Sequence, residues 1–279
     1  MSTTRRFTQL DVFTAAPLKG NALAVVHDAE GLSDAQMAAF ARWTNLSETT
    51  FLLPPTTPDA DYRVRIFTPG GELPFAGHPT LGSCHAWLAA GGRARSSGAV
   101  VQECGVGLVR IRRDGSRLAF AAPPLRRSGA VDAATLEHAA RSLKIPRDAM
   151  RASNWVDNGP GWVAVMLGAR DEVLALQPDF AAMRGLKLGV VAPCPTGHDA
   201  QFEVRAFVPT LGVPEDPVTG SLNAGLAQWL IGTGLAPPRY VAAQGTALGR
   251  DGRVFVEQVG DDVWVGGDSV IVVGGQVML

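Results

Sequence analysis

The sequence lacks the features that recruit large or charged partners. Its 25 Lys and Arg residues nearly balance its 26 Asp and Glu residues, so a formal net charge of −1 offers no general attraction for nucleic acid or an anionic membrane. The cysteines, Cys84, Cys104 and Cys194, are odd in number and widely spaced, which fits neither a disulfide framework nor a CxxC zinc site. They are expected to be buried thiols in a reducing compartment, and a small ligand is the better expectation for a partner.

Several segment types are also missing. The N-terminus carries two arginines but no uninterrupted apolar run, and no window reaches transmembrane length, which predicts a cytoplasmic protein without a membrane partner. There is no P-loop, no GxSxG elbow and no histidine pair at metal-ligand spacing. A glycine-rich stretch, GGDSVIVVGG, lacks the strand, GxGxxG and helix order of a dinucleotide site. We therefore expect no cofactor, no metal and no nucleic acid.

What the chain does contain is an internal repeat. YRVRIFTP at 62–69 recurs as FEVRAFVP at 202–209, with Arg65 and Arg205 aligned at an offset of 140 (205 − 65). Each copy is followed by a polar, proline-containing loop and then by an apolar segment that closes on AWL or QWL. Landmarks that recur in the same order at nearly the same separation indicate two related halves.

The proposed division falls in a Pro/Gly/Arg stretch without periodicity, giving halves 1–126 and 127–279. The last strand is a candidate to pair with the N-terminal half instead of its own. With 279 residues, of which 46% are hydrophobic, the chain can bury two modest cores.

Both halves contain segments with the apolar spacing of helices and short runs typical of strands. The spacing predicts helices over SDAQMAAFARWT with Ser33 as the N-cap, over HPTLGSCHAWLAAGG, over DAATLEHAARSL and over TGSLNAGLAQWLIGTG. Runs rich in β-branched and aromatic residues predict strands around them, including LAVVH, TTFLLPP and YRVRIFT in the first half and GWVAVMLG, KLGVVAP and FEVRAFV in the second. The fold class is therefore α+β, with each half a mostly antiparallel sheet wrapped around one central helix.

Two of the predicted helices start with residues suited to binding an anion. Gly77 and His78 open one, and Gly220 and Ser221 open the other. A helix start offers unpaired backbone N–H groups, and glycine lets a ligand approach them closely. If the halves are related by a pseudo-twofold axis, the two starts are expected to face each other, hold a carboxylate and stabilise an enolate-like oxyanion. The alternative for His78 is an ordinary polar residue at a helix start.

A carboxylate-binding site still needs a base, and two acidic residues are candidates. Glu48 lies in a polar turn before an apolar run, where the alternative is a capping or surface carboxylate. Asp216 precedes proline on the loop that leads into the second helix start, where the alternative is an Asx turn. Asn21 follows Gly20 in what is either a ligand-side turn or an ordinary hairpin turn.

These segments together resemble a known family. DVFTAAPLKGNALAVV, LSETTF, FTPGGELPFAGHPTLG, EDPVTGSLNAGL and QGTALGRDGRV are similar, in order and spacing over nearly the whole chain, to PhzF-like proteins of phenazine biosynthesis. The resemblance implies the diaminopimelate epimerase-like fold, two pseudo-symmetric domains with the active site between them, and a homodimer. It also implies a small-molecule substrate.

The resemblance also implies roles for single residues. The glutamate of SETTF, here Glu48, moves a proton in the isomerisation of trans-2,3-dihydro-3-hydroxyanthranilate, and the counterparts His78, Asp216 and Ser221 assist or bind. The related epimerases carry a catalytic cysteine at each helix start. Glycine stands at those places here, at Gly77 and Gly220, which disfavours two-thiol racemisation.

These observations predict a cofactor-independent isomerase in which Glu48 is the general acid/base, with Glu48, His78 and Asp216 catalytic. Substrate binding is assigned to the lining residues Asn21, Gly77, Gly220 and Ser221. The alternatives are a non-catalytic small-molecule binding protein with the same cleft, and epimerase or lactone chemistry on an unrelated acid. Leu222, where a small residue is expected, either narrows the pocket or enters the core, and the core is favoured.

Overall fold

The computed structural model describes residues 3–209 and 214–279, so part of the loop that precedes the second predicted helix start lies outside it. The chain divides into two compact units, residues 1–121 with 266–279, and residues 122–265. The expected boundary at 126/127 thus falls slightly late, and the C-terminal strand belongs to the first unit. No helix among the described residues is long and apolar enough to span a bilayer.

The first unit contains two helices and most of its strands before residue 122. In chain order its elements are β1 (Thr4–Val12), β2 (Asn21–Val26), α1 (Asp34–Thr44), β3 (Glu48–Leu53), β4 (Tyr62–Thr68), β5 (Gly71–Leu73), α2 (Gly77–Ala89), β6 (Ala99–Cys104), β7 (Gly107–Asp114), β8 (Arg117–Ala121) and β18 (Ser269–Met278). The strands pair in the order β18-β1-β2-β3-β4-β6-β7-β8, with β5 also on β4. Only β2–β3 and β4–β6 are parallel among these pairs.

The second unit repeats this order. Its elements are β9 (Arg127–Gly129), α3 (Ala133–Leu143), η1 (Arg147–Ala149), β10 (Ala152–Asp157), β11 (Trp162–Met166), α4 (Arg170–Ala175), β12 (Lys187–Pro193), β13 (Phe202–Phe207), β14 (Glu215–Asp216), α5 (Gly220–Gly232), β15 (Arg239–Gln244), η3 (Thr246–Leu248) and β16 (Gly252–Val259), and β17 (Asp262–Gly267) crosses the division. The pairing is β9-β10-β11-β12-β13-β15-β16, with β14 on β13. Here β11–β12 and β13–β15 are the parallel pairs, which matches the first unit strand for strand.

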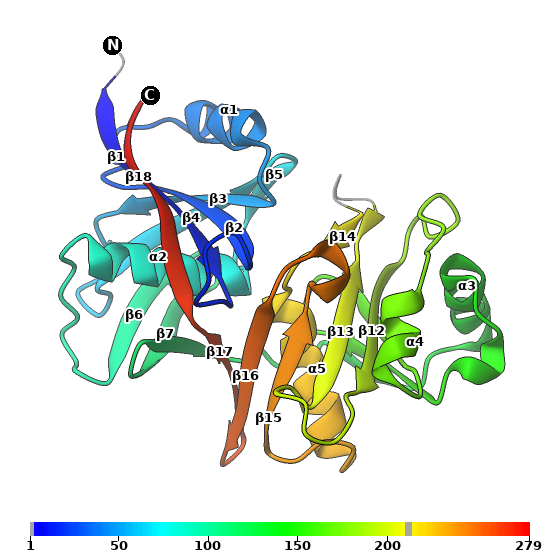
Figure 1. Ribbon diagram of the computed structural model, residues 1–279. Helices are drawn as coiled ribbons and strands as arrows, with labels where there is room; N and C mark the ends of the chain where they lie inside the picture. The colour runs from blue at the N-terminus through cyan, green and yellow to red at the C-terminus, as the bar shows by residue number, and fades with distance from the viewer. Residues whose placement is uncertain (1–2, 210–213) are drawn as a thin grey trace. The chain divides into compact units, whose positions relative to one another are not determined.

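A central helix lies against the strands of each unit. α2 contacts β1, β2, β3 and β8, while α5 contacts β10, β11 and β16 (Figure 1). Both helices carry a glycine at their sixth residue, Gly82 and Gly225, where a Cβ atom would lie 2.5 Å from Leu23 Cδ2 and 2.3 Å from the Val156 carbonyl oxygen, respectively. The close approach of helix to sheet therefore requires glycine at both positions.

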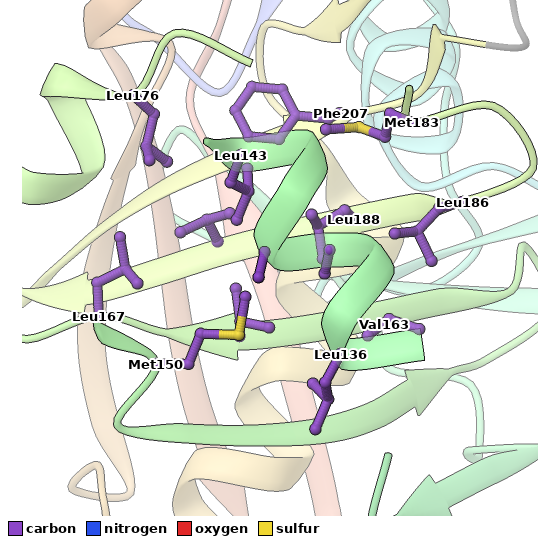
Figure 2. Packing of buried hydrophobic residues seen from close by; sticks show 14 of the residues in the cluster. Leu136, Leu143, Met150, Val163, Leu167, Leu176, Met183, Leu186, Leu188 and Phe207 are labelled. Atoms are coloured by element: carbon purple, nitrogen blue, oxygen red, sulfur yellow. The ribbon is translucent and has the colours of Figure 1, made fainter. Parts of the chain in front are cut away.

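The opposite face of each sheet is covered by a second apolar layer. In the first unit α1 supplies Met37, Phe40 and Ala41 to a cluster with Phe51 and Phe67. In the second unit Figure 2 shows α3 lying across the sheet, with Leu136 and Leu143 packed near Val163, Leu188 and other buried residues. Each sheet is therefore mainly apolar on both faces. Polar side chains on the face that contacts the central helix are consequently candidates for function.

The corresponding strands β4 and β13 each carry an arginine that forms an ion pair with a glutamate. Arg65 donates to Glu72 from Nε and Nη2 at 2.7 and 2.6 Å, and Arg205 donates to Glu215 at 2.9 and 2.7 Å. The first pair lies near solvent, whereas both side chains of the second are 7% exposed. The α+β fold with two similar halves, expected from the sequence repeat, is confirmed.

Candidate active site

Strand alternation brings Glu48 to the central-helix face of the first sheet. Thr50 accepts a hydrogen bond from the Ser83 hydroxyl of α2 at 2.9 Å, so this side of β3 faces the helix. Residues two apart on a strand share a face, so Glu48, the first residue of β3, points the same way. Its side chain is 15% exposed. Glu48 is thus not a surface carboxylate, which was one of the simpler interpretations of its sequence context.

His78 is the second residue of α2 and contacts Glu48. The imidazole Nε2 lies 3.4 Å from Glu48 Oε2, without the alignment of a hydrogen bond, and His78 is 4% exposed. Burial lowers the pKa of His78 to about 3, because the charged imidazolium is poorly solvated there. The ring is therefore neutral at pH 7, and its contact with the carboxylate is not a salt bridge.

Asn21 fixes which ring nitrogen of His78 carries the proton. Its amide Nδ2 lies 3.4 Å from His78 Nδ1, and its Oδ1 accepts from the Ser47 hydroxyl at 3.3 Å. An amide nitrogen can only donate, so Nδ1 accepts and the ring proton resides on Nε2, the atom that faces Glu48. The expected substrate ligand Asn21 thus lies against His78. Ser47 was not singled out in the sequence, although it directly precedes Glu48.

The N-cap residues of the two central helices do not cap them with their own side chains. Ser33 caps α1 and Asp132 caps α3 through backbone N–H groups of their first turns. By contrast, Ala76 at the start of α2 and Thr219 at the start of α5 accept no such bond. Orphan N–H groups and the positive end of the helix dipole make such starts suitable for an anion.

In the second unit, the loop before α5 is held by one glutamine. Gln244 accepts from the Thr219 backbone N–H at 3.0 Å and donates to the Asp216 carbonyl oxygen at 3.1 Å and to Thr219 Oγ1 at 3.0 Å. The Thr219 hydroxyl in turn donates to Asp216 Oδ2 at 2.6 Å. Asp216 is therefore oriented by its own loop. Gln244 was missed at the sequence level, because nothing about a single glutamine distinguishes it before its partners are known.

Ser221, the second residue of α5, accepts a hydrogen bond from the indole of Trp162 at 3.0 Å. Leu222 beside it is fully buried, and its side chain covers Gly189, where a Cβ atom would lie 2.4 Å from Leu222 Cδ1. Leu222 is therefore a core residue, which was the favoured expectation.

The register shows that Glu48 has no acidic counterpart. Glu48 is opposite Leu23 in the parallel β2–β3 pair, and Lys187 is opposite Trp162 in the corresponding β11–β12 pair. The corresponding place in the second unit thus holds a lysine. The cysteines do not replace the base, since Cys84 is buried within α2 and Cys104 and Cys194 lie on or beside strands.

The predicted site residues therefore fall into two sets. The first unit holds Glu48, His78 and Asn21 together, with Gly77 as the first residue of α2. The second unit holds three, which are Asp216, Gly220 and Ser221. That both sets serve one substrate stays a prediction.

A separate hollow of about 480 Å³ lies at the other end of α2. It is lined by Trp87, Gly91 and Gly92 of the helix end, by apolar residues, and by the charged or polar residues Arg6, His27, Asp28 and Asp61. The Asp61 carboxylate already accepts from the Arg95 and Val101 N–H groups at 3.1 and 2.8 Å, and His27 Nε2 lies 3.0 Å from Thr8 Oγ1. Because these polar groups are already engaged, the start of α2 remains the better candidate site.

Comparison with solved structures first defines the class. A PhzF-family protein of Bacillus anthracis superposes with a TM-score of 0.84, covering 99% of this chain and all of that one at 22% identity. A hydroxyproline epimerase of Agrobacterium vitis has the same general fold, with a TM-score of 0.58 and 14% identity over 99% and 93% of the two chains. The fold is thus epimerase-like, as expected.

Sequence comparison then gives the family. The model for phenazine biosynthesis-like proteins, PhzC-PhzF, matches residues 10–275, and the chain belongs to that family. It is 37% identical to "Antisense-enhancing sequence 1" of Schizosaccharomyces pombe, over 98% of this chain and 96% of the other. It is 34% identical to the trans-2,3-dihydro-3-hydroxyanthranilate isomerase of Pseudomonas aeruginosa, over 91% of both. The expected enzyme class, isomerase, is confirmed.

Proposed function

We propose that this isomerase moves a proton on a small, carboxylate-bearing metabolite, with Glu48 as the general acid/base and without a cofactor. The observation that carries the proposal is the contact of the Glu48 carboxylate with a buried, neutral His78 in the first turn of α2. The related isomerase of Pseudomonas aeruginosa acts on trans-2,3-dihydro-3-hydroxyanthranilate, so a cyclic, unsaturated amino acid of that kind is the proposed substrate class.

The proposed reaction is a balanced proton shift. Glu48 takes a proton from a carbon next to unsaturation, the electron pair of that C–H bond delocalises into the unsaturated system, and the same carboxyl group returns the proton to a different carbon. His78 has its ring proton on Nε2, beside Glu48, where it can stabilise the carboxylate and the delocalised anion. No net oxidation occurs, so the reaction requires no redox partner.

The second unit is proposed to bind and assist. The backbone N–H groups of Gly220 and Ser221 in the first turn of α5 would hold the substrate carboxylate, as that of Gly77 would in the first unit, and Asp216 would contact a polar substituent. The family resemblance also predicts a homodimer, which sedimentation velocity would test directly.

The test is solvent-deuterium exchange followed by NMR. Wild type is incubated in D₂O with trans-2,3-dihydro-3-hydroxyanthranilate and with a panel of small unsaturated amino and hydroxy acids. We expect deuterium at a carbon next to unsaturation, and we expect Glu48→Gln to abolish it while binding is retained. Glu72→Gln is the matched control, since Glu72 is a carboxylate of the same unit that is engaged by Arg65.

The exchange experiment also distinguishes the isomerase from the alternative functions, which are a binding protein, an epimerase and an enzyme of lactone chemistry. Binding without exchange in both wild type and Glu48→Gln would contradict an isomerase acting on these acids and would favour a binding protein. Exchange at a stereocentre that only inverts configuration would instead indicate an epimerase. Lactone hydrolysis would appear as a new hydroxy acid without carbon-bound deuterium.

A further inference from the structure

We propose that Trp162 is a positioning residue that orients the hydroxyl of Ser221 so that it donates a hydrogen bond to an anionic oxygen of the ligand. This inference rests on the proposed function only in assuming that the start of α5 meets the substrate carboxylate. Neither the sequence repeat nor the relatives' names point to Trp162.

The direction of the hydrogen bond is unambiguous. Trp162 Nε1 lies 3.0 Å from Ser221 Oγ, and an indole N–H has no acceptor capacity, so the serine oxygen must accept. A serine hydroxyl carries a single hydrogen, and within residues 3–209 and 214–279 no acceptor for it is found. The hydroxyl hydrogen is therefore left to donate to a bound group.

Trp162 is held firmly enough to set this direction. It is 2% exposed, and it is the first residue of β11. Val163 and Val165 on the same strand point into the cluster under α3, as Figure 2 shows for Val163. Strand alternation therefore turns Trp162 to the opposite face, toward α5.

The backbone of Ser221 is anchored as well. Asn158 donates from Nδ2 to the Ser221 carbonyl oxygen at 2.8 Å. The first turn of α5 is thus fixed by one contact to the side chain and one to the main chain of the same residue. Because the main chain and the side-chain oxygen of Ser221 are both held, the main motion left to this residue is rotation of its hydroxyl hydrogen.

The first unit has a similar arrangement, in which a strand residue donates a hydrogen bond to the second residue of the central helix. There Asn21 on β2, the strand that corresponds to β11, donates to His78, the second residue of α2. In both units a nitrogen donor on the corresponding strand bonds to an acceptor of the helix-start side chain. His78 consequently donates through Nε2–H, and the Ser221 hydroxyl hydrogen is directed away from the indole, so that it can donate as well.

This arrangement predicts a preference for anions. A hydroxyl whose hydrogen is directed at the ligand makes a charge-assisted bond to a carboxylate, which is stronger than the bond it makes to the neutral carbonyl oxygen of a carboxamide. The chain should therefore discriminate a carboxylate from the isosteric carboxamide, and Trp162 should supply part of that discrimination.

The test replaces Trp162 by 3-benzothienylalanine, which has nearly the shape of tryptophan but carries sulfur in place of the N–H. Trp155 in the same unit is the matched control, because its indole Nε1 is buried and makes no hydrogen bond to any described residue. Anthranilate and anthranilamide are the probes, and isothermal titration calorimetry gives both affinities for each protein.

We expect the Trp162 replacement to weaken anthranilate roughly 5- to 30-fold, the effect of losing one orienting hydrogen bond, and to weaken anthranilamide by a smaller factor, because its carbonyl oxygen is uncharged. The Trp155 replacement should change neither affinity. In a Ser221→Ala background the Trp162 replacement should cost nothing further, which a general loss of packing would not reproduce.

An unchanged ratio of carboxylate to carboxamide affinity in the Trp162 protein would overturn the inference, and so would a wild type that does not prefer anthranilate. The proposed isomerase function is judged separately by deuterium exchange. If exchange is absent but the Trp162 effect is present, the anion-binding role of Trp162 stands and the proton-transfer function fails.

Discussion

The repeated arginine-glutamate pair offers a matched experiment on burial within one chain. Replacing Arg205 by methionine would leave the Glu215 carboxylate, 7% exposed, without its cation. It would also remove the donor that serves the Val173 and Leu176 carbonyl oxygens at 3.1 and 2.9 Å. Breaking a buried pair by removing one partner costs about 3–5 kcal/mol of folding free energy.

The corresponding substitution in the first unit should be far milder. Arg65 contacts Glu72 and Asp34, whose side chains are 42% and 83% exposed and remain hydrated when the arginine is lost. Exposed pairs contribute about 0.2–1 kcal/mol each, so Arg65→Met should cost no more than about 2 kcal/mol. The bidentate geometry is the same in both pairs, so the difference between the two variants reports the burial of Glu215 together with the lost bonds to the Val173 and Leu176 carbonyl oxygens.

Urea denaturation gives the free energy of unfolding, and amide hydrogen exchange read by mass spectrometry assigns the loss to one unit. We expect Arg205→Met to accelerate exchange in β12 and β13 and Arg65→Met to leave β3 and β4 nearly unchanged. The double variant Arg205→Met/Glu215→Leu should recover most of the loss, since no charge stays buried. Equal losses from the two single variants, or no recovery in the double variant, would refute this reasoning.

Two further predictions concern pH and helix packing. Because burial lowers the pKa of His78 from 6.5 to about 3, the unfolded chain binds a proton below pH 6.5 that the folded protein does not bind until about pH 3. Wild type should therefore lose about 2 kcal/mol relative to His78→Gln between pH 7 and pH 5 in urea titrations, and parallel profiles would contradict the burial argument. Gly225→Ala should cost more than Gly82→Ala, above about 3 against about 1–3 kcal/mol, because the new Cβ meets a backbone carbonyl in the first case and movable side chains in the second. Thermal unfolding of the two variants tests this order.

Much of the architecture was predictable because the signals are local or repeated. Ser33 and the apolar spacing after it predicted α1, and the structure shows the complete capping box with Gln36. The two central helices were predicted from proline near the first start and glycine near both ends. The short helix α4 was not, since its six residues carry too little periodicity and its position depends on packing against β12 and β13.

The site was predicted at the level of residue types but not of contacts. The sequence identified Glu48 and His78, and the structure places them 3.4 Å apart. It assigned Asn21 to the substrate, which stays a prediction, and the structure adds the contact of its amide with His78. Ser47 and Trp162 were missed, because a side chain that only orients another becomes visible when strand register and helix position are both known.

The register gives a physical reason for chemistry with a single base. A racemase that removes a proton from one face of a carbon and returns it from the other needs a base on each side. Duplication has given this chain two sheets with the same strand order, yet the place of Glu48 is taken by Lys187 in the second sheet, and the helix starts carry glycine in both. The halves thus share helix starts with glycine but differ at the place of Glu48. A carboxylate at this place in one half only is suited to moving a proton between two carbons on one face of a substrate, which is the reaction proposed for Glu48.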